Sequence, residues 1–165
     1  MEQKTNEYRL RAWGAFLHAY ATLIPILERE MQEDKGLPLV WFDVLAQLRA
    51  SPEEGRLRMQ DLAGSVLLIT RSGLTRLIER MEKEGLVIRE HSLEDRRNVY
   101  AVITPKGRAT LEGAIPGHHR GVQEHFLQHM SDEEIQGLHV ALSRVLEAEN
   151  AAGEKWWRFP SDSSD

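Results

Sequence analysis

Hydrophobic residues between positions 70 and 85 recur every three or four residues, the period of a helix with one buried face. They are Leu74, Leu77, Ile78 and Met81. Thr70 or Ser72 can cap the start of such a helix, and Gly85 can adopt the left-handed conformation that ends it. The pattern therefore predicts an amphipathic helix over Thr70–Gly85.

The opposite face of this predicted helix carries hydrogen-bond donors and little that could build a core. Its members are Thr70, Arg71, Ser72, Thr75, Arg76 and Arg80. Such donors suit phosphate oxygens and the base edges exposed in the major groove of DNA. A solvated basic face on an ordinary surface helix has the same pattern, so the neighbouring segments must distinguish the two interpretations.

The segments before this helix also follow a helical period. Hydrophobic residues recur at threes and fours over residues 5–35 and again over 38–50, which predicts two helices. Pro25 should kink the first of them or remove one of its hydrogen bonds. Residues 57–58 form a short strand in this prediction, and 59–66 form a third, short helix. A short helix, a turn and a longer helix with a polar outer face make a helix-turn-helix.

After Gly85 the hydrophobic period changes from 3.6 to 2, which predicts two strands over 87–91 and 98–103. The charged segment SLEDRR, residues 92–97, connects them. A hairpin tip with Arg96 and Arg97 side by side suggests a finger that suits the narrow, electronegative minor groove. A charged tip that serves only solubility is the alternative.

Helical periodicity returns at the C-terminal end of the chain. Thr104 followed by proline is a strong start signal for a helix, which we expect over 105–130 with a bend or break at 115–117. Residues 131–134 form a capping box that opens a last helix ending near Asn150. A first helix as long as 5–35 exposes an apolar face that a small monomer cannot bury. This length favours packing of that face against another helix, for which a second subunit is one source.

The charge of the chain is unevenly distributed. The net charge is −5, but residues 56–108 hold eleven basic and seven acidic side chains, a local charge of +4 that leaves −9 for the rest. A basic middle between acidic flanks directs a polyanion to the middle. There is no cysteine, which excludes disulfides and thiolate zinc sites. No signal peptide or apolar run of about 20 residues is evident, so we expect a cytoplasmic protein without membrane contact.

Metal and enzyme functions have weaker support in the sequence. The histidines His118, His119, His125 and His129 invite a zinc interpretation, but zinc needs three or four ligands, and acidic ones would have to come from residues such as Glu124. Solvated or interfacial histidines are the favoured alternative, so no metal and no cofactor is expected. The chain holds no phosphate loop, no GxSxG and no HExxH signature, and we expect no enzyme.

Two segments resemble the multiple-antibiotic-resistance regulator (MarR) family of dimeric winged-helix transcription factors. They are RSGLTRLIERMEKEGLV at 71–87 and EDRRNVYAVITPKGRA at 94–109, within a wider resemblance over 12–150. The Asp-Arg-Arg tip followed by a strand and Ile-Thr-Pro-x-Gly is close to diagnostic. The spacing from Leu62 to Thr75 is one residue longer than the commonest form, which leaves Thr70, Arg71 and Ser72 as alternative helix starts.

The resemblance implies roles for individual residues. Ser72, Gly73, Thr75 and Arg76 match positions where the family's recognition helix touches bases and phosphates, and Arg80 lies near its phosphate contacts. Arg97 matches the wing arginine that enters the minor groove, while Asp95 and Arg96 match residues that shape the wing tip. With the basic helix face, the expected DNA-binding set is Thr70, Arg71, Ser72, Gly73, Thr75, Arg76, Arg80, Asp95, Arg96 and Arg97.

We therefore expect a mainly α-helical protein in three parts. Residues 38–104 form a winged helix-turn-helix DNA-binding domain with a two-stranded wing, and 5–36 with 105–150 form a helical dimerisation domain. Residues 151–165 form a tail, for which docking on the partner subunit is one interpretation. The aromatic residues of this tail are Trp156, Trp157 and Phe159.

The expected function is that of a homodimeric transcriptional regulator, a repressor, on pseudo-palindromic double-stranded DNA. Family members often bind small anionic aromatic molecules between the dimer helices and the winged domain. Aromatic surface, a cation and an imidazole suit a phenolic carboxylate, although ordinary core positions explain the aromatic residues equally. The candidate residues are Arg11, Trp13, His18, Tyr20 and Trp41. The alternative function is a winged-helix dimerisation or docking module that does not bind DNA.

Overall fold

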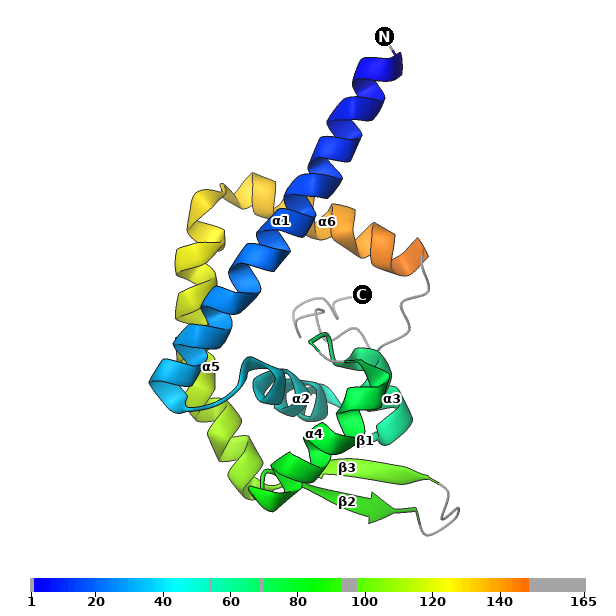
Figure 1. Cartoon of the computed structure of the whole chain (residues 1–165), viewed down its shortest axis with the longest axis vertical. Coiled ribbons are helices and arrows are strands. Elements are labelled where there is room, and N and C mark those ends of the chain that lie inside the picture. Colours follow the sequence, from blue (N-terminus) through cyan, green and yellow to red (C-terminus); the bar gives the residue numbers. More distant parts are fainter. Residues whose placement is uncertain (1, 54, 69, 93–97, 149–165) are drawn as a thin grey trace.

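The computed structural model describes residues 2–53, 55–68, 70–92 and 98–148. Its elements in chain order are α1 (Glu2–Lys35), α2 (Leu39–Ala50), β1 (Arg56–Arg58), α3 (Met59–Ser65), α4 (Arg71–Lys83), β2 (Val87–His91), β3 (Val99–Ile103), α5 (Pro105–His125), the 3-10 helix η1 (Leu127–His129) and α6 (Asp132–Ala148). Helices α1 and α5 run side by side, and the N-terminal half of α1 extends beyond the rest of the molecule (Figure 1). The helix-turn-helix and the sheet lie at the opposite end.

The hydrophobic core lies where α2, α4 and α5 meet the sheet. The four hydrophobic positions predicted to face inward on α4 are at most 1% exposed, which confirms that face. Leu45 of α2 and Leu111 of α5 belong to the same buried cluster, and so does Met31 near the end of α1. A single core therefore holds the helix-turn-helix against the long helices.

The sheet has three antiparallel strands in the order β1-β3-β2. β2 and β3 form the predicted hairpin, with His91 opposite Val99 at its outer end. The short strand predicted at residues 57–58 is present as β1, which pairs with β3 so that Arg58 lies opposite Tyr100. The expected winged helix-turn-helix with long terminal helices is confirmed.

The break predicted at 115–117 is wrong, whereas the alternatives of a bend there and of a kink or lost hydrogen bond at Pro25 stay predictions. α1 continues through Pro25, and α5 continues through Pro116 to His125, where Phe126 leaves helical geometry with a φ of −131°. Both prolines are exposed. A proline inside a helix costs about 3 kcal/mol even at an exposed position, so the packing of α1 against α5 must offset that cost. His125 also fastens the end of α5 to α1 through a contact of 2.6 Å with Glu30.

Apolar side chains remain exposed on the helices outside this core. Trp13 on α1 is 59% exposed and stacks on Phe16, one helical turn away, and none of the described residues of α6 is buried. By length and composition, Glu7–Lys35 also meets the criterion for a membrane-crossing helix, which the sequence analysis did not anticipate. A long helix that uses one apolar face for a protein interface meets the same criterion.

Candidate nucleic-acid interface

Helix α4 has the defined start and end that the sequence left open. It begins at Arg71 after Thr70, whose carbonyl accepts the N–H of Gly73 at 2.9 Å, while the Thr70 hydroxyl pairs with that of Ser72 at 3.2 Å. At the other end Gly85 has a φ of +71°, and the N–H of Leu86 donates to the carbonyl of Met81. This Schellman arrangement requires a residue that tolerates positive φ, which explains the glycine.

The predicted polar face of α4 is open to solvent. Thr70, Ser72, Thr75, Arg76 and Arg80 are exposed, and Gly73 is half-buried. Arg71 is the first helical residue, and its side chain lies outside the described part of the structure. The hydroxyl and guanidinium groups of the helix thus point away from the core, along a single face.

The wing begins next to this face, at the strands that follow α4. The N–H of Ser92 donates to the carbonyl of Asn98 at 2.9 Å and extends the strand pairing at the outer end of the hairpin. The predicted tip residues Asp95, Arg96 and Arg97 lie outside the described residues. Their roles therefore stay predictions.

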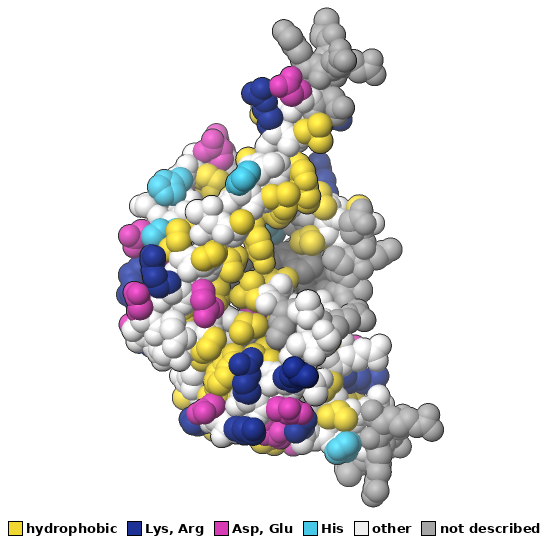
Figure 2. Space-filling view, in the orientation of Figure 1, with side chains coloured by type: hydrophobic (Ala, Val, Ile, Leu, Met, Phe, Trp, Pro, Cys, Tyr) yellow, Lys and Arg dark blue, Asp and Glu magenta, His cyan; other side chains and the backbone are white. Residues whose placement is uncertain are grey.

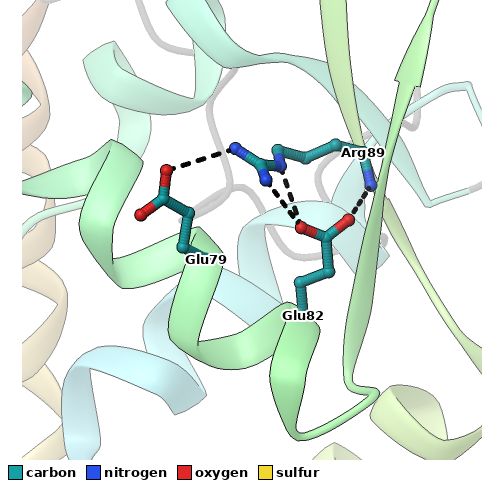
Figure 3. A network of polar contacts seen from close by, with 3 residues as sticks. All are labelled: Glu79, Glu82 and Arg89. Carbon is teal, nitrogen blue, oxygen red and sulfur yellow. Dashed lines mark hydrogen bonds and ion pairs between the residues drawn. The ribbon is translucent and has the colours of Figure 1, made fainter.

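An ion-pair network joins α4 to the first wing strand (Figure 3). Arg89 on β2 contacts the Glu82 carboxylate through its backbone N–H at 3.1 Å, its Nε at 2.9 Å and a terminal guanidinium nitrogen at 2.9 Å. The other terminal nitrogen lies 3.5 Å from Glu79. The network ties the wing to the recognition helix, and it also neutralises two of the helix's carboxylates.

The arginines of the outer face are left available for a ligand. Among the residues that the structure describes, neither Arg76 nor Arg80 has an ion-pair partner, whereas Arg89 occupies Glu79 and Glu82. Lys and Arg side chains, interspersed with Asp and Glu, lie over the end that holds α4 and the sheet, while hydrophobic side chains gather between that end and the top of α1 (Figure 2). This end of the molecule therefore suits an extended anion.

The start of α5 is fastened to the end of α4. The Thr104 hydroxyl accepts the N–H of Gly107 at 3.0 Å and donates to the carbonyl of Gly85 at 2.7 Å. A Cβ atom on Gly107 would collide with the carbonyl oxygen of Leu86, so only glycine fits there. The Thr-Pro-Lys-Gly motif, singled out as a helix start, thus also fixes where the recognition helix ends relative to α5.

Sequence reasoning missed a buried carboxylate beneath the turn that precedes α4. Asp43 of α2 is 9% exposed, and its Oδ2 accepts the backbone N–H of Leu67 at 2.7 Å. Its Oδ1 accepts a hydrogen bond from Gln47 at 3.3 Å. Burial raises the pKa of Asp43 despite these hydrogen bonds, which favour the carboxylate. An acidic residue within the hydrophobic segment LVWFDVL was the available signal.

The candidate effector residues are not gathered at one cavity within the described chain. Arg11, Trp13, His18 and Tyr20 are exposed along α1, with Arg11 paired to Glu7 at 2.7 Å, and Trp41 is half-buried on α2. A cavity of about 410 Å³ lies lower down, between α1 and α5, and contains none of them. Its lining comprises Leu27, Glu30, Met31, Glu33, Asp34, Gly117, His118, Arg120, Gly121 and Glu124.

The histidines of α5 have separate surroundings. His118 packs on Phe42 with ring centroids 4.5 Å apart, and burial, followed by the charge of His119, lowers the pKa of His118. His125 instead contacts Glu30. Within the described ranges, no three His, Asp or Glu side chains are placed to hold a metal ion.

The fold and the exposed basic helix define a winged helix-turn-helix protein, and comparisons identify its family. A sequence profile of the MarR family matches residues 35–98. The transcriptional regulator MhqR of Bacillus subtilis is 32% identical over 85% of this chain and 92% of its own. The chain belongs to the MarR family of DNA-binding transcriptional regulators.

Solved structures agree with this assignment. Sco3205, a MarR family transcriptional regulator from Streptomyces coelicolor solved in complex with DNA, has a TM-score of 0.76 and 33% identity, covering 84% of this chain and 86% of that one. BpsR of Bordetella bronchiseptica, whose DNA binding is regulated by 6-hydroxynicotinic acid, has a TM-score of 0.69 and 25% identity. That match covers 80% of this chain and 90% of BpsR.

Proposed function

We propose that the protein is a cytoplasmic, dimeric repressor that binds pseudo-palindromic operators through α4 and the wing. The observation that carries this proposal is the exposed polar face of α4, where Arg76 and Arg80 lack ion-pair partners among the described residues beside a wing held by Arg89. The contact residues are Thr70, Arg71, Ser72, Gly73, Thr75 and Arg76, then Arg80 and the tip residues Asp95, Arg96 and Arg97.

Dimerisation follows from the apolar side chains that α1 and α6 leave exposed. A contiguous apolar surface of this kind on a water-soluble domain marks an interface, and a second copy of the same helices is the occupant we propose. A two-fold dimer would present two recognition helices to half-sites about 10 bp apart. The side chains concerned are Tyr8, Leu10, Trp13, Phe16, Leu17 and Tyr20 on α1 and Val140, Val145 and Leu146 on α6.

Release by a small anionic aromatic ligand is the regulatory part of the proposal. BpsR, which responds to 6-hydroxynicotinic acid, supplies the analogy. In this chain Arg11, Trp13, His18, Tyr20 and Trp41 would line the site once a partner subunit covers α1. Such a ligand acts by favouring a spacing of recognition helices that does not fit DNA. Titration with salicylate should then weaken DNA binding and raise Tm; no change in either would remove the ligand from the proposal.

DNase footprinting on the DNA upstream of the protein's own gene tests the operator directly. We expect two protected half-sites with centres about one helical turn apart. Uniform protection at every sequence would contradict a sequence-specific regulator. The alternative, a docking module that does not bind DNA, predicts no protection at any protein concentration. It also predicts no salt-dependent affinity for DNA.

A further inference from the structure

The first half of α2 takes part in two backbone-to-carboxylate hydrogen bonds, one with α1 and one with the turn before α4. At its start, Oε2 of Glu28 on α1 accepts the backbone N–H of Leu39 at 2.8 Å. Four residues further along, Oδ2 of Asp43 accepts the N–H of Leu67 in the turn between α3 and α4. Helix α2 therefore stands between the long helix α1 and the turn that leads into the recognition helix.

The first contact fixes α2 itself. The first N–H groups of a helix have no partner within it, and a carboxylate there is favoured by both hydrogen bonding and the helix dipole. The hydrophobic side chains around it, including Leu45 and Leu48, are fully buried in the core. Asp43 thus acts from a rigid support, which a residue that positions another element requires.

The second contact fixes the turn before α4. The Thr70 side chain does not cap the N-terminus of α4, and its hydroxyl pairs with that of Ser72 instead. The Leu67 side chain is 57% exposed and therefore cannot anchor the turn by burial. Within the described turn, Val66 is buried in the core, while the Asp43 carboxylate binds the backbone of Leu67 and Leu68. Gln47 holds the other carboxylate oxygen of Asp43.

We propose that Asp43 is a positioning residue for DNA binding: its buried carboxylate fixes the turn that aims α4, without touching DNA itself. This inference rests on the proposed function, because it explains what fixes the orientation of a helix that binds DNA. If the turn is loosened, α4 loses the alignment that its contacts with base edges need. Contacts with phosphates tolerate a displacement of the helix. Operator binding should therefore suffer and sequence-independent binding should not.

The test compares Asp43→Asn with Asp61→Asn, an exposed aspartate on α3. Both variants remove one negative charge close to the DNA-binding end, so the charge change is matched. The probes are the footprinted upstream duplex and a random duplex of equal length, at one salt concentration. We expect Asp43→Asn to bind the operator about tenfold more weakly, the scale of one charge-assisted hydrogen bond, and the random duplex unchanged. Asp61→Asn should match the wild type on both.

The possible results distinguish a failure of the positioning role of Asp43 from a failure of the proposed function. Operator affinity of Asp43→Asn within twofold of wild type would overturn the positioning role. Equal weakening on both duplexes would mean general loss of structure, which also overturns it. A wild type that does not prefer the operator would contradict the proposed function instead.

Amide hydrogen exchange tests the positioning role without DNA. In free Asp43→Asn we expect faster exchange in the described turn residues and the first turn of α4, and unchanged exchange in α5. Unchanged exchange around Leu67 would overturn the inference even if DNA binding is absent.

Discussion

The network of Arg89 and Glu82 should couple the wing to the recognition helix by a measurable free energy. Replacing Arg89 with methionine keeps the aliphatic stem and removes the guanidinium, and Glu82→Gln keeps the shape and removes the charge. Oε2 of Glu82 receives two guanidinium contacts of 2.9 Å and Oε1 accepts the backbone N–H of Arg89 at 3.1 Å, so both carboxylate oxygens are bound by one residue.

The size of the coupling free energy depends on how far the two side chains are exposed to solvent. The Arg89 and Glu82 side chains are 35% and 33% exposed, so solvent screens the pair and the full strength of a buried charge-assisted bond does not apply. We expect a coupling free energy of about 1 kcal/mol at low salt, the upper end for exposed pairs, and less as salt screens it.

A double-mutant cycle on urea unfolding measures this coupling. The two single variants, the double variant and the wild type are unfolded at one protein concentration, because the proposed dimer would make stability depend on concentration. Arg11 and Glu7 provide the matched control: their contact is 2.7 Å, but the side chains are 76% and 64% exposed. A cycle for Arg89 and Glu82 no larger than that for Arg11 and Glu7 would refute the reasoning.

Three further variants test the packing around α4. Gly107→Ala should lower the free energy of unfolding by about 1–3 kcal/mol because its Cβ meets the Leu86 carbonyl, whereas Gly113→Ala, with open space around it, should not lower Tm. Thr104→Ala should cost about 1 kcal/mol in thermal or urea unfolding through loss of the α5 cap. Burial raises the pKa of Asp43 in the folded protein above its usual value of 3.8. The protonated carboxyl therefore contributes stability below pH 3.8, and this contribution is lost as the pH rises through the pKa of the folded state. Unfolding measured from pH 3 to 7 should show Asp43→Asn gaining stability relative to wild type as pH rises; a flat difference would contradict the pKa shift.

Local sequence signals carried the prediction of the fold a long way. The spacing of Leu74, Leu77, Ile78 and Met81 identified the buried face of α4, because a helical period and burial both act over a few residues. Thr104 before proline and glycine at 85 marked ends of helices for the same reason.

Interactions between distant segments were beyond such signals. The spacing could not tell that Asp43 meets Leu67, since the two are 24 residues apart and the contact depends on how α2 packs. The contact of Arg89 with Glu82 likewise needs the turn at Gly85 to bring a strand back along its helix. Proline disfavours helix interiors, which predicted a bend or break at Pro116, but α5 continues through it because the packing of α5 against α1 and α2 depends on the tertiary fold.

The salt dependence of DNA binding tests the central claim, that the outer face of α4 grips the DNA backbone, most directly. The slope of log K against log salt would be measured on the upstream duplex for wild type, Arg76→Ala and Arg29→Ala, the last an exposed arginine on α1. We expect a steep negative slope for wild type, a slope smaller by about 1 for Arg76→Ala, and no change for Arg29→Ala. Identical slopes for all three proteins, or binding indifferent to salt, would contradict the account.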